Sequence, residues 1–165
     1  MSEVPSPPKK EVEFRVQGED WSKYEILDGK AVVWVRVVLL KLYELSGQTV
    51  SPGGVTTPVY EGQTQFLVTT FFDESLRTND TTKMQLIPAD EIRQKGLDVP
   101  FQALDEPWNE YLVSGPKPQL LRSKCVASRI HYLANRYNRQ GDPGVWVEAG
   151  ILLGSPRDAN AHNVP

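Results

Sequence analysis

The stretch that decides the fold is residues 24–45, YEILDGKAVVWVRVVLLKLYEL. An Asp-Gly pair at residues 28–29 separates a short apolar segment from a longer one that begins at Ala31. Asp-Gly between two apolar runs is typical of a β-hairpin, because glycine tolerates the positive φ angle that a tight turn requires. The sequence therefore predicts two antiparallel strands joined by a turn at residues 28–29.

Both faces of the longer strand are apolar. Successive side chains of a strand point to opposite faces, and polar alternation is absent here until Lys41. We expect both faces to be covered, by the same chain or by a second one. Arg36 interrupts one face, and a buried arginine needs a carboxylate partner. One face contains Ala31, Val33, Val35, Val37 and Leu39. The other face, which Arg36 interrupts, contains Val32, Trp34, Val38, Leu40 and Leu42.

The remainder of the chain is also rich in strand signals. Apolar and β-branched segments bounded by Gly, Pro and Asp predict further strands, and Pro88, an acidic first turn and Gly96 indicate a short helix at 88–96. We predict an α+β fold that is mainly β: an antiparallel sheet or small β-barrel with one amphipathic helix, at about 119–138, packed on it. The predicted strands are 12–17, 23–45, 59–72, 83–87 and 145–153.

The longer helix is predicted from the spacing of its apolar residues. At 100° per residue, Val126, Ile130, Leu133 and Tyr137 fall within one arc of about 60°. Arg122, Arg129 and Arg136 are seven residues apart and would stack along one edge of this helix.

The chain of 165 residues is expected to form one domain. Residues 1–10, rich in Pro, Ser and Lys, are expected to form a flexible or extended arm, residues 11–154 a β-rich domain, and residues 155–165 a tail. A cytoplasmic location is expected, because the N-terminus lacks an apolar signal-peptide core and Cys125 is the single cysteine. No segment approaches the ~20 apolar residues of a membrane helix.

The sequence contains no constellation typical of catalysis or of a cofactor site. Arg122 and Arg129, one helical turn away on either side, could lower the pKa of the Cys125 thiol, but a lone cysteine in a helix is usually a packing residue. His131 has no carboxylate or second histidine one helical turn away. The acidic residues around Trp108 are interpreted as a solvated loop, and no phosphate-binding or nucleophile-elbow motif is present. We therefore expect a protein that is not an enzyme and that holds no cofactor and no metal.

The charge of the chain is unevenly distributed. Residues 111–141 contain six Lys or Arg and no Asp or Glu, which leaves 12 basic and 21 acidic residues, a net charge of −9, for the remainder. The arginines therefore face either acidic groups, in the same fold or in a second copy, or the phosphates of a nucleic acid, with Tyr132 and Tyr137 available for stacking. The overall charge of −3 favours the acidic partner.

These observations lead to two functional hypotheses. The first is a non-enzymatic structural or accessory subunit that self-associates or docks in a larger protein assembly through its long apolar strand, its tails and its arginine-rich edge. The alternative is a small β-rich nucleic-acid-binding domain that uses the basic segment 117–139. The predicted partner-binding residues are Arg122, Arg129, Arg136, Tyr132 and Arg36.

Overall fold

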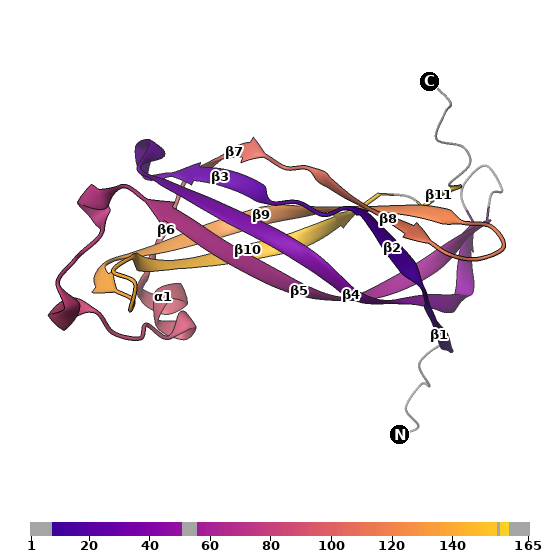
Figure 1. The fold of residues 1–165 in the computed structure, drawn as a ribbon, viewed down its shortest axis with the longest axis horizontal. Helices are drawn as coiled ribbons and strands as arrows, with labels where there is room; N and C mark the ends of the chain where they lie inside the picture. The colour runs from indigo at the N-terminus through magenta and orange to yellow at the C-terminus, as the bar shows by residue number, and fades with distance from the viewer. Residues whose placement is uncertain (1–7, 51–55, 155, 159–165) are drawn as a thin grey trace.

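The computed structural model describes residues 8–50, 56–154 and 156–158, and its strands form two antiparallel sheets (Figure 1). The prediction of a mainly β, α+β fold is confirmed, and within the described residues the sheets do not join into a closed barrel. The first sheet contains β1 (Lys9–Val12), β3 (Ser22–Ile26), β4 (Ala31–Val50), β5 (Thr56–Phe72) and β7 (Phe101–Asp105). The second contains β2 (Phe14–Gly18), β6 (Leu97–Val99), β8 (Trp108–Val113), β9 (Gln119–Tyr137), β10 (Pro143–Leu153) and β11 (Arg157–Asp158).

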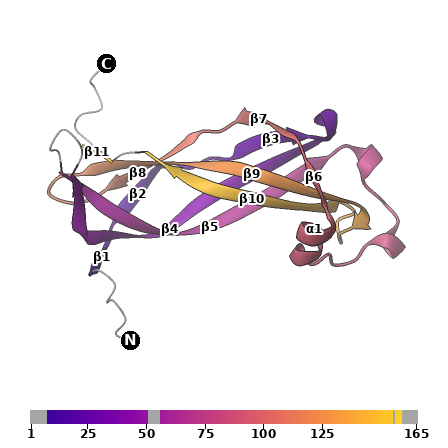
Figure 2. The same ribbon diagram turned by 180° about the vertical axis from the view of Figure 1, so that it is seen from behind.

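Each sheet is built around one long central strand that runs along the long axis of the molecule (Figures 1 and 2). In the first sheet, β4 pairs with β5 along one edge and with β3 and then β1 along the other. In the second sheet, β9 pairs with β10 and β11 along one edge and with β8 and β6 along the other. Over its described residues, the chain passes between the sheets five times. Four of these crossings, β1 to β2, β2 to β3, β6 to β7 and β7 to β8, link strands on the side away from β5 and β10. The fifth, from β5 to β6, runs through the segment that contains α1.

The hydrophobic core lies between the sheets. Of the two apolar faces of β4, the one that starts at Ala31 points inward and is buried, whereas the other is half-buried. The expectation that both faces are fully covered therefore holds within this chain for one face only. The buried core residues are Tyr24, Ile26, Ala31, Val33, Val35, Val37, Cys125, Ala127 and Ile130.

The predicted hairpin at residues 28–29 is confirmed, although its turn is longer than two residues. Ile26 pairs with Ala31, and the turn between them contains a 3-10 segment, Leu27–Gly29. Leu27, Asp28 and Gly29 all have positive φ angles, of 55°, 54° and 85°. The Asp-Gly signal thus located the turn correctly, because both residues tolerate this left-handed conformation.

The predicted long helix at 119–138 is wrong, because these residues form the strand β9. Two irregularities explain the misleading spacing. A bulge at Ser128, opposite the Glu148–Ala149 step, places Ala127 and Ile130 on the same inner face three residues apart, as in a helix. Near the end of β9, Asn135 has a positive φ of 66° where a second register shift occurs. Pairing on both edges fixes the extended conformation despite the helical spacing of the apolar residues.

The helical segments lie outside the two sheets. The predicted short helix at 88–96 is confirmed as α1 (Ala89–Lys95), which lies at one end of the molecule (Figures 1 and 2). Its buried residue Ile92 packs on Gly144 of β10, where an added Cβ would lie only 3.0 Å from the Ile92 side chain. The predicted strand at 83–87 is wrong: Met84 makes one isolated bridge, and the segment follows two 3-10 turns, Glu74–Leu76 and Thr81–Lys83.

The predicted arm at 1–10 and tail at 155–165 lie mostly outside the described residues. Within them, Lys9 and Lys10 belong to β1, which pairs with β4. Arg157 and Asp158 form β11, which pairs with β9.

Side chains from β3 satisfy the backbone of β9 where its edge has no strand partner, between the parts that pair with β8 and β6. The Ser22 hydroxyl donates to the carbonyl of Cys125 at 2.6 Å, and the amide of Ala127 donates to the Tyr24 hydroxyl at 2.9 Å. The Tyr24 hydroxyl in turn donates to Glu106 at 2.9 Å. Since both β3 residues are buried, these bonds join the two sheets inside the core.

Glu19 fills the corresponding gap along β4, between the segments paired with β3 and β1. Its carboxylate accepts from the amide of Leu39 at 3.2 Å and from the Tyr111 hydroxyl at 2.8 Å. Leu39 lies at the register shift of the β4–β5 pair, so this carboxylate satisfies the backbone at a bulge. Both central strands are thus completed by side chains from residues 19–24.

We predict that replacing Tyr24 with phenylalanine lowers the free energy of unfolding by about 1–3 kcal/mol, because the buried amide of Ala127 then loses its acceptor. Tyr43→Phe is the matched control: the ring contacts Lys9, and removing the hydroxyl should change stability by no more than about 0.5 kcal/mol. Urea unfolding followed by circular dichroism measures both. Equal stabilities of Y24F and Y43F would show that Tyr24 does not join the sheets.

We also predict that stability falls above about pH 9. Burial, with a smaller contribution from Glu106, raises the pKa of the Cys125 thiol from its ordinary 9.0 to about 11, and burial also raises the pKa values of Tyr24 and Tyr111. These groups ionise in the unfolded chain at a pH at which the folded chain keeps them neutral. Their stabilising contribution is therefore complete below about pH 9 and decreases as the pH rises, by up to about 1.4 kcal/mol per pH unit for each group.

Urea unfolding of the wild type and of Cys125→Ala from about pH 8 to about pH 10 tests this pH dependence. The C125A variant should lose stability less steeply with rising pH, whatever its stability at neutral pH. Parallel pH profiles for the two proteins would contradict the assignment to Cys125.

Candidate functional site

The edge strand β5 carries a row of exposed apolar side chains beside the core. In the part of the chain that the structure describes, β5 pairs with β4 and its other edge has no neighbouring strand. Its residues 62–72 include no charged residue and no proline. Four large side chains along this segment are exposed: Phe66 by 40%, Leu67 by 39%, Val68 by 48% and Phe71 by 52%.

These exposed side chains belong to both faces of the sheet. Val68 lies opposite Val35, a core position, and so points to the inner face. Leu67 lies opposite Arg36 and points to the outer face. A side chain at a sheet edge is exposed on either face when no further strand lies beside it, so the pattern marks a free edge and not a single exposed face.

An aromatic cluster covers part of the outer face beside this edge. The ring of Trp34 lies 6.0 Å from that of Trp21 and 4.9 Å from that of Phe71, measured between centroids. Lys23 places its ammonium group 4.4 Å from the centre of the Trp34 ring. The cluster explains how the second apolar face of β4 is half-covered by its own chain.

The predicted carboxylate partner of Arg36 is Glu19 of the same chain, with 3.4 Å between the two side chains. The carboxylate is the more deeply buried partner: the Glu19 side chain is 6% exposed and the Arg36 side chain 31%. Arg36 is therefore only partly buried, and its guanidinium also lies 5.9 Å from the centre of the Trp21 ring. Its position ties the outer face of β4 to the segment that crosses between the sheets.

The three predicted arginines of β9 do not form one row. Because β9 is a strand, they are spread along its length and meet carboxylates on three different elements. Arg122 lies 3.4 Å from Glu110 of β8, and its guanidinium stacks on Trp108. Arg129 lies 3.2 Å from Asp98 of β6, and Arg136 pairs with Glu91 of α1. Tyr132 is half-buried between its paired neighbours Leu97 and Val145, and burial raises its pKa.

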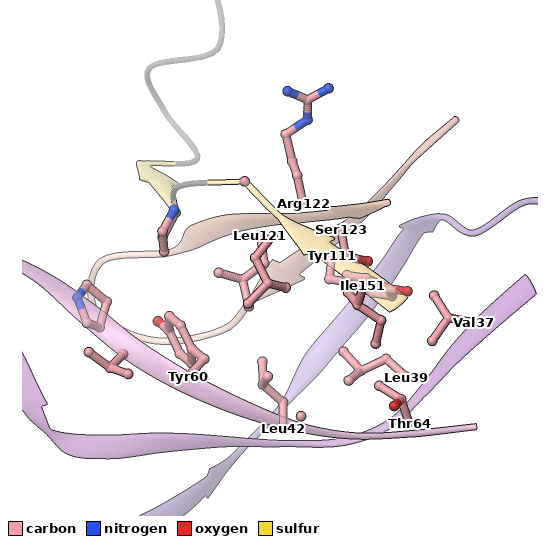
Figure 3. Close-up of a pocket in the computed structure, with 16 residues that line it drawn as sticks. Val37, Leu39, Leu42, Tyr60, Thr64, Tyr111, Leu121, Arg122, Ser123 and Ile151 are labelled. Carbon is pink, nitrogen blue, oxygen red and sulfur yellow. The ribbon is translucent and has the colours of Figure 1, made fainter. Parts of the chain in front are cut away.

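A cavity of about 740 Å³ opens between the sheets (Figure 3). Side chains of β4 and β5 form one wall, and side chains of β8, β9 and β10 form the other. Its lining is mainly aliphatic and includes Val37, Leu39, Leu42, Leu121 and Ile151. The guanidinium of Arg122 points away from the cavity, so that residue lines it through the base of its side chain (Figure 3).

Other reactive side chains are placed where they have a structural role. Cys125 is buried, and its pKa is raised, which disfavours the thiolate that a nucleophile requires. His131 is buried with its Nε2 3.4 Å from a carboxylate oxygen of Glu148. Within the described residues, no group of three or more His, Cys, Asp or Glu could hold a metal ion. Over the same residues, no helix has the length and apolar character required to cross a membrane.

Two of these features were missed from the sequence, for different reasons. The free edge of β5 could have been inferred from the sequence, because residues 62–72 contain no charged residue and no proline and so lack the features that usually protect an edge strand. The sequence gives no indication of the cavity, because its walls come from five strands whose arrangement depends on the pairing within both sheets.

Comparison with known proteins gives no family for this chain. No protein-family model matches the sequence, and searches of curated proteins and of solved structures found no significant match.

Proposed function

We propose that the protein is a non-enzymatic structural or accessory subunit that self-associates through β5, whose free edge pairs with the same strand of a second copy. The observation that carries this proposal is the long, uncharged edge between residues 62 and 72, with apolar side chains exposed on both faces. A further strand beside it would cover both sets of side chains and would satisfy the free backbone groups of the edge.

The lack of protection at this edge supports a partner there. Edge strands of monomeric proteins are usually short or carry lysine, proline or bulges that prevent pairing with another chain. β5 extends over Thr56–Phe72, and residues 62–72 include none of the protective residue types. By contrast, the edge strand of the second sheet, β10, includes Glu148 near its middle.

The sequence of the edge also favours a second copy as the partner. Residues 62–72 are limited to Gly, Gln, Thr, Phe, Leu and Val, so antiparallel pairing with an identical segment brings no like charges together in any register. Such pairing about a two-fold axis uses the same surface on both subunits, the commonest symmetry of soluble oligomers. Joining two edges would make one continuous sheet across the dimer.

The other predicted contacts contribute less to this proposal. Arg122, Arg129 and Arg136 each contact a carboxylate of the same chain, which supports the acidic-partner interpretation within the fold. The alternative of a nucleic-acid site along 117–139 stays a prediction without a geometric observation in its favour. A cytoplasmic location is part of the proposal, on the basis of the single cysteine, which fits a reducing compartment.

We predict that the double substitution Gln65→Lys and Leu67→Lys converts an oligomer into a monomer. Both residues are exposed, and both lie opposite outer-face positions of β4, so the lysines extend into water and leave the core intact. Two lysines on each paired edge would place like charges close together across the interface. Multi-angle light scattering should give a dimer mass, or a multiple of it, for the wild type at micromolar concentration and a monomer mass for the variant.

The chain offers a control of matched composition at a distant site. Gln85 and Leu86 are the same two residue types, both exposed, in the segment before α1. The Q85K/L86K variant should keep the wild-type mass, and circular dichroism should show the same fold for all three proteins. A monomeric wild type, or a Q65K/L67K variant that keeps the wild-type mass, would refute self-association through β5.

A further inference from the structure

The cavity between the sheets has the dimensions and walls of a small-molecule site. Its volume of about 740 Å³ lies within the ~300–1,000 Å³ that is usual for ligand pockets. Its walls reach the core, since Val37, Leu42, Tyr111 and Ser123 are buried side chains that line it. Protein interiors are closely packed, so a space of this size that none of the described residues fills favours an occupant beside the buried aliphatic side chains.

The lining restricts the chemistry of the occupant. No charged group of the lining points inward, because the guanidinium of Arg122 lies on the outer surface, over Trp108 (Figure 3). The buried polar side chains on the wall are Tyr111 and Ser123. The Tyr111 hydroxyl donates to Glu19 and so already has a partner, which leaves the small Ser123 hydroxyl on a mainly aliphatic wall. The remaining depth of the cavity therefore suits a ligand without hydrogen-bonding groups of its own.

A peptide is a poor match for the interior. The walls are the faces of two sheets, and the backbone groups of β4 and β9 bond to neighbouring strands or, at Leu39, Cys125 and Ala127, to side chains of residues 19–24. A peptide inserted there would leave its own amide and carbonyl groups without partners, at a considerable cost. A chain of methylene groups has no such requirement and gains from contact with Leu39, Leu121 and Ile151.

We propose that this cavity binds the alkyl chain of a single-chain amphiphile, such as a fatty acid or a fatty alcohol. The chain lies between the β4–β5 wall and the β8–β9–β10 wall, and its polar end stays at the mouth. Leu153 and Ile151 border the mouth, with 72% and 36% of their surfaces exposed. An anionic end is kept away from the deep wall by the buried carboxylate of Glu19 behind Tyr111.

Isothermal titration calorimetry of the full chain with decanoate, octanoate and decan-1-ol tests this proposal. We expect saturable binding of one ligand per chain and an affinity that rises about tenfold for two added methylene groups, from octanoate to decanoate. Comparing decanoate with decan-1-ol shows the role of the head group. Equal affinities would mean that the protein recognises the alkyl chain alone, and a higher affinity for decanoate would mean that its carboxylate makes an additional charged contact at the mouth of the cavity. No saturable binding of any of the three would overturn the proposal.

Adjacent residues of β10 provide a matched pair of variants. Ile151→Trp fills the cavity and should weaken decanoate binding at least about tenfold, whereas Leu152→Trp, which does not line the cavity, should leave it unchanged. If I151W fails to fold by circular dichroism, Leu153→Trp at the exposed mouth replaces it, with a smaller loss expected. Equal affinities of I151W and L152W would refute the site. Decanoate is also titrated into the Q65K/L67K protein. Neither Gln65 nor Leu67 lines the cavity, so ligand binding can be measured there independently of self-association.

Discussion

The hydrogen bond between the Tyr24 hydroxyl and the amide of Ala127 is the contact on which the two-sheet arrangement depends. It lies in the core, at a position where β9 has no neighbouring strand on one edge, and it is reinforced by the bond from Ser22 to Cys125. Glu19, a few residues earlier, performs the same function for β4. One short segment, residues 19–24, therefore supplies the polar groups that both central strands lack and links the two sheets across the apolar core.

This arrangement also determines where the molecule is open. Four of the five crossings between the sheets lie on the side near β3 and β8, and the buried hydrogen bonds of Ser22 and Tyr24 lie on the same side. The crossing from β5 to β6 passes β10 only at the end of the molecule where α1 packs against it, and the described residues place no strand between β5 and β10. The free edge proposed for self-association and the cavity proposed for an alkyl chain both adjoin this open side. The two proposals therefore share one structural cause, although the residues that test them are different.

The sequence predicted the features of the fold that are encoded locally. The Asp28-Gly29 turn, the strand from Ala31 and the short helix before Gly96 depend on nearby residues and were predicted correctly. The segment 119–138 was predicted as a helix because bulges at Ser128 and near Asn135 break the alternation of β9 and imitate helical spacing. A similar limit applied to the site. The sequence indicated that Arg36 needs a carboxylate partner, but only the position of residues 19–24 in the fold identifies that partner as Glu19.

The Tyr24 contact has a consequence for the order in which the chain folds. The pairs β3–β4, β4–β5, β8–β9 and β9–β10 are formed by strands adjacent in sequence, so each closes a short loop. The bond from Tyr24 to Ala127, by contrast, spans 103 residues. Early hairpins followed by late docking of the sheets is therefore the expected pathway, with folding as slow as in other proteins of high contact order. On this pathway a substitution at Tyr24 mainly accelerates unfolding, which stopped-flow kinetics would distinguish from a slower folding rate.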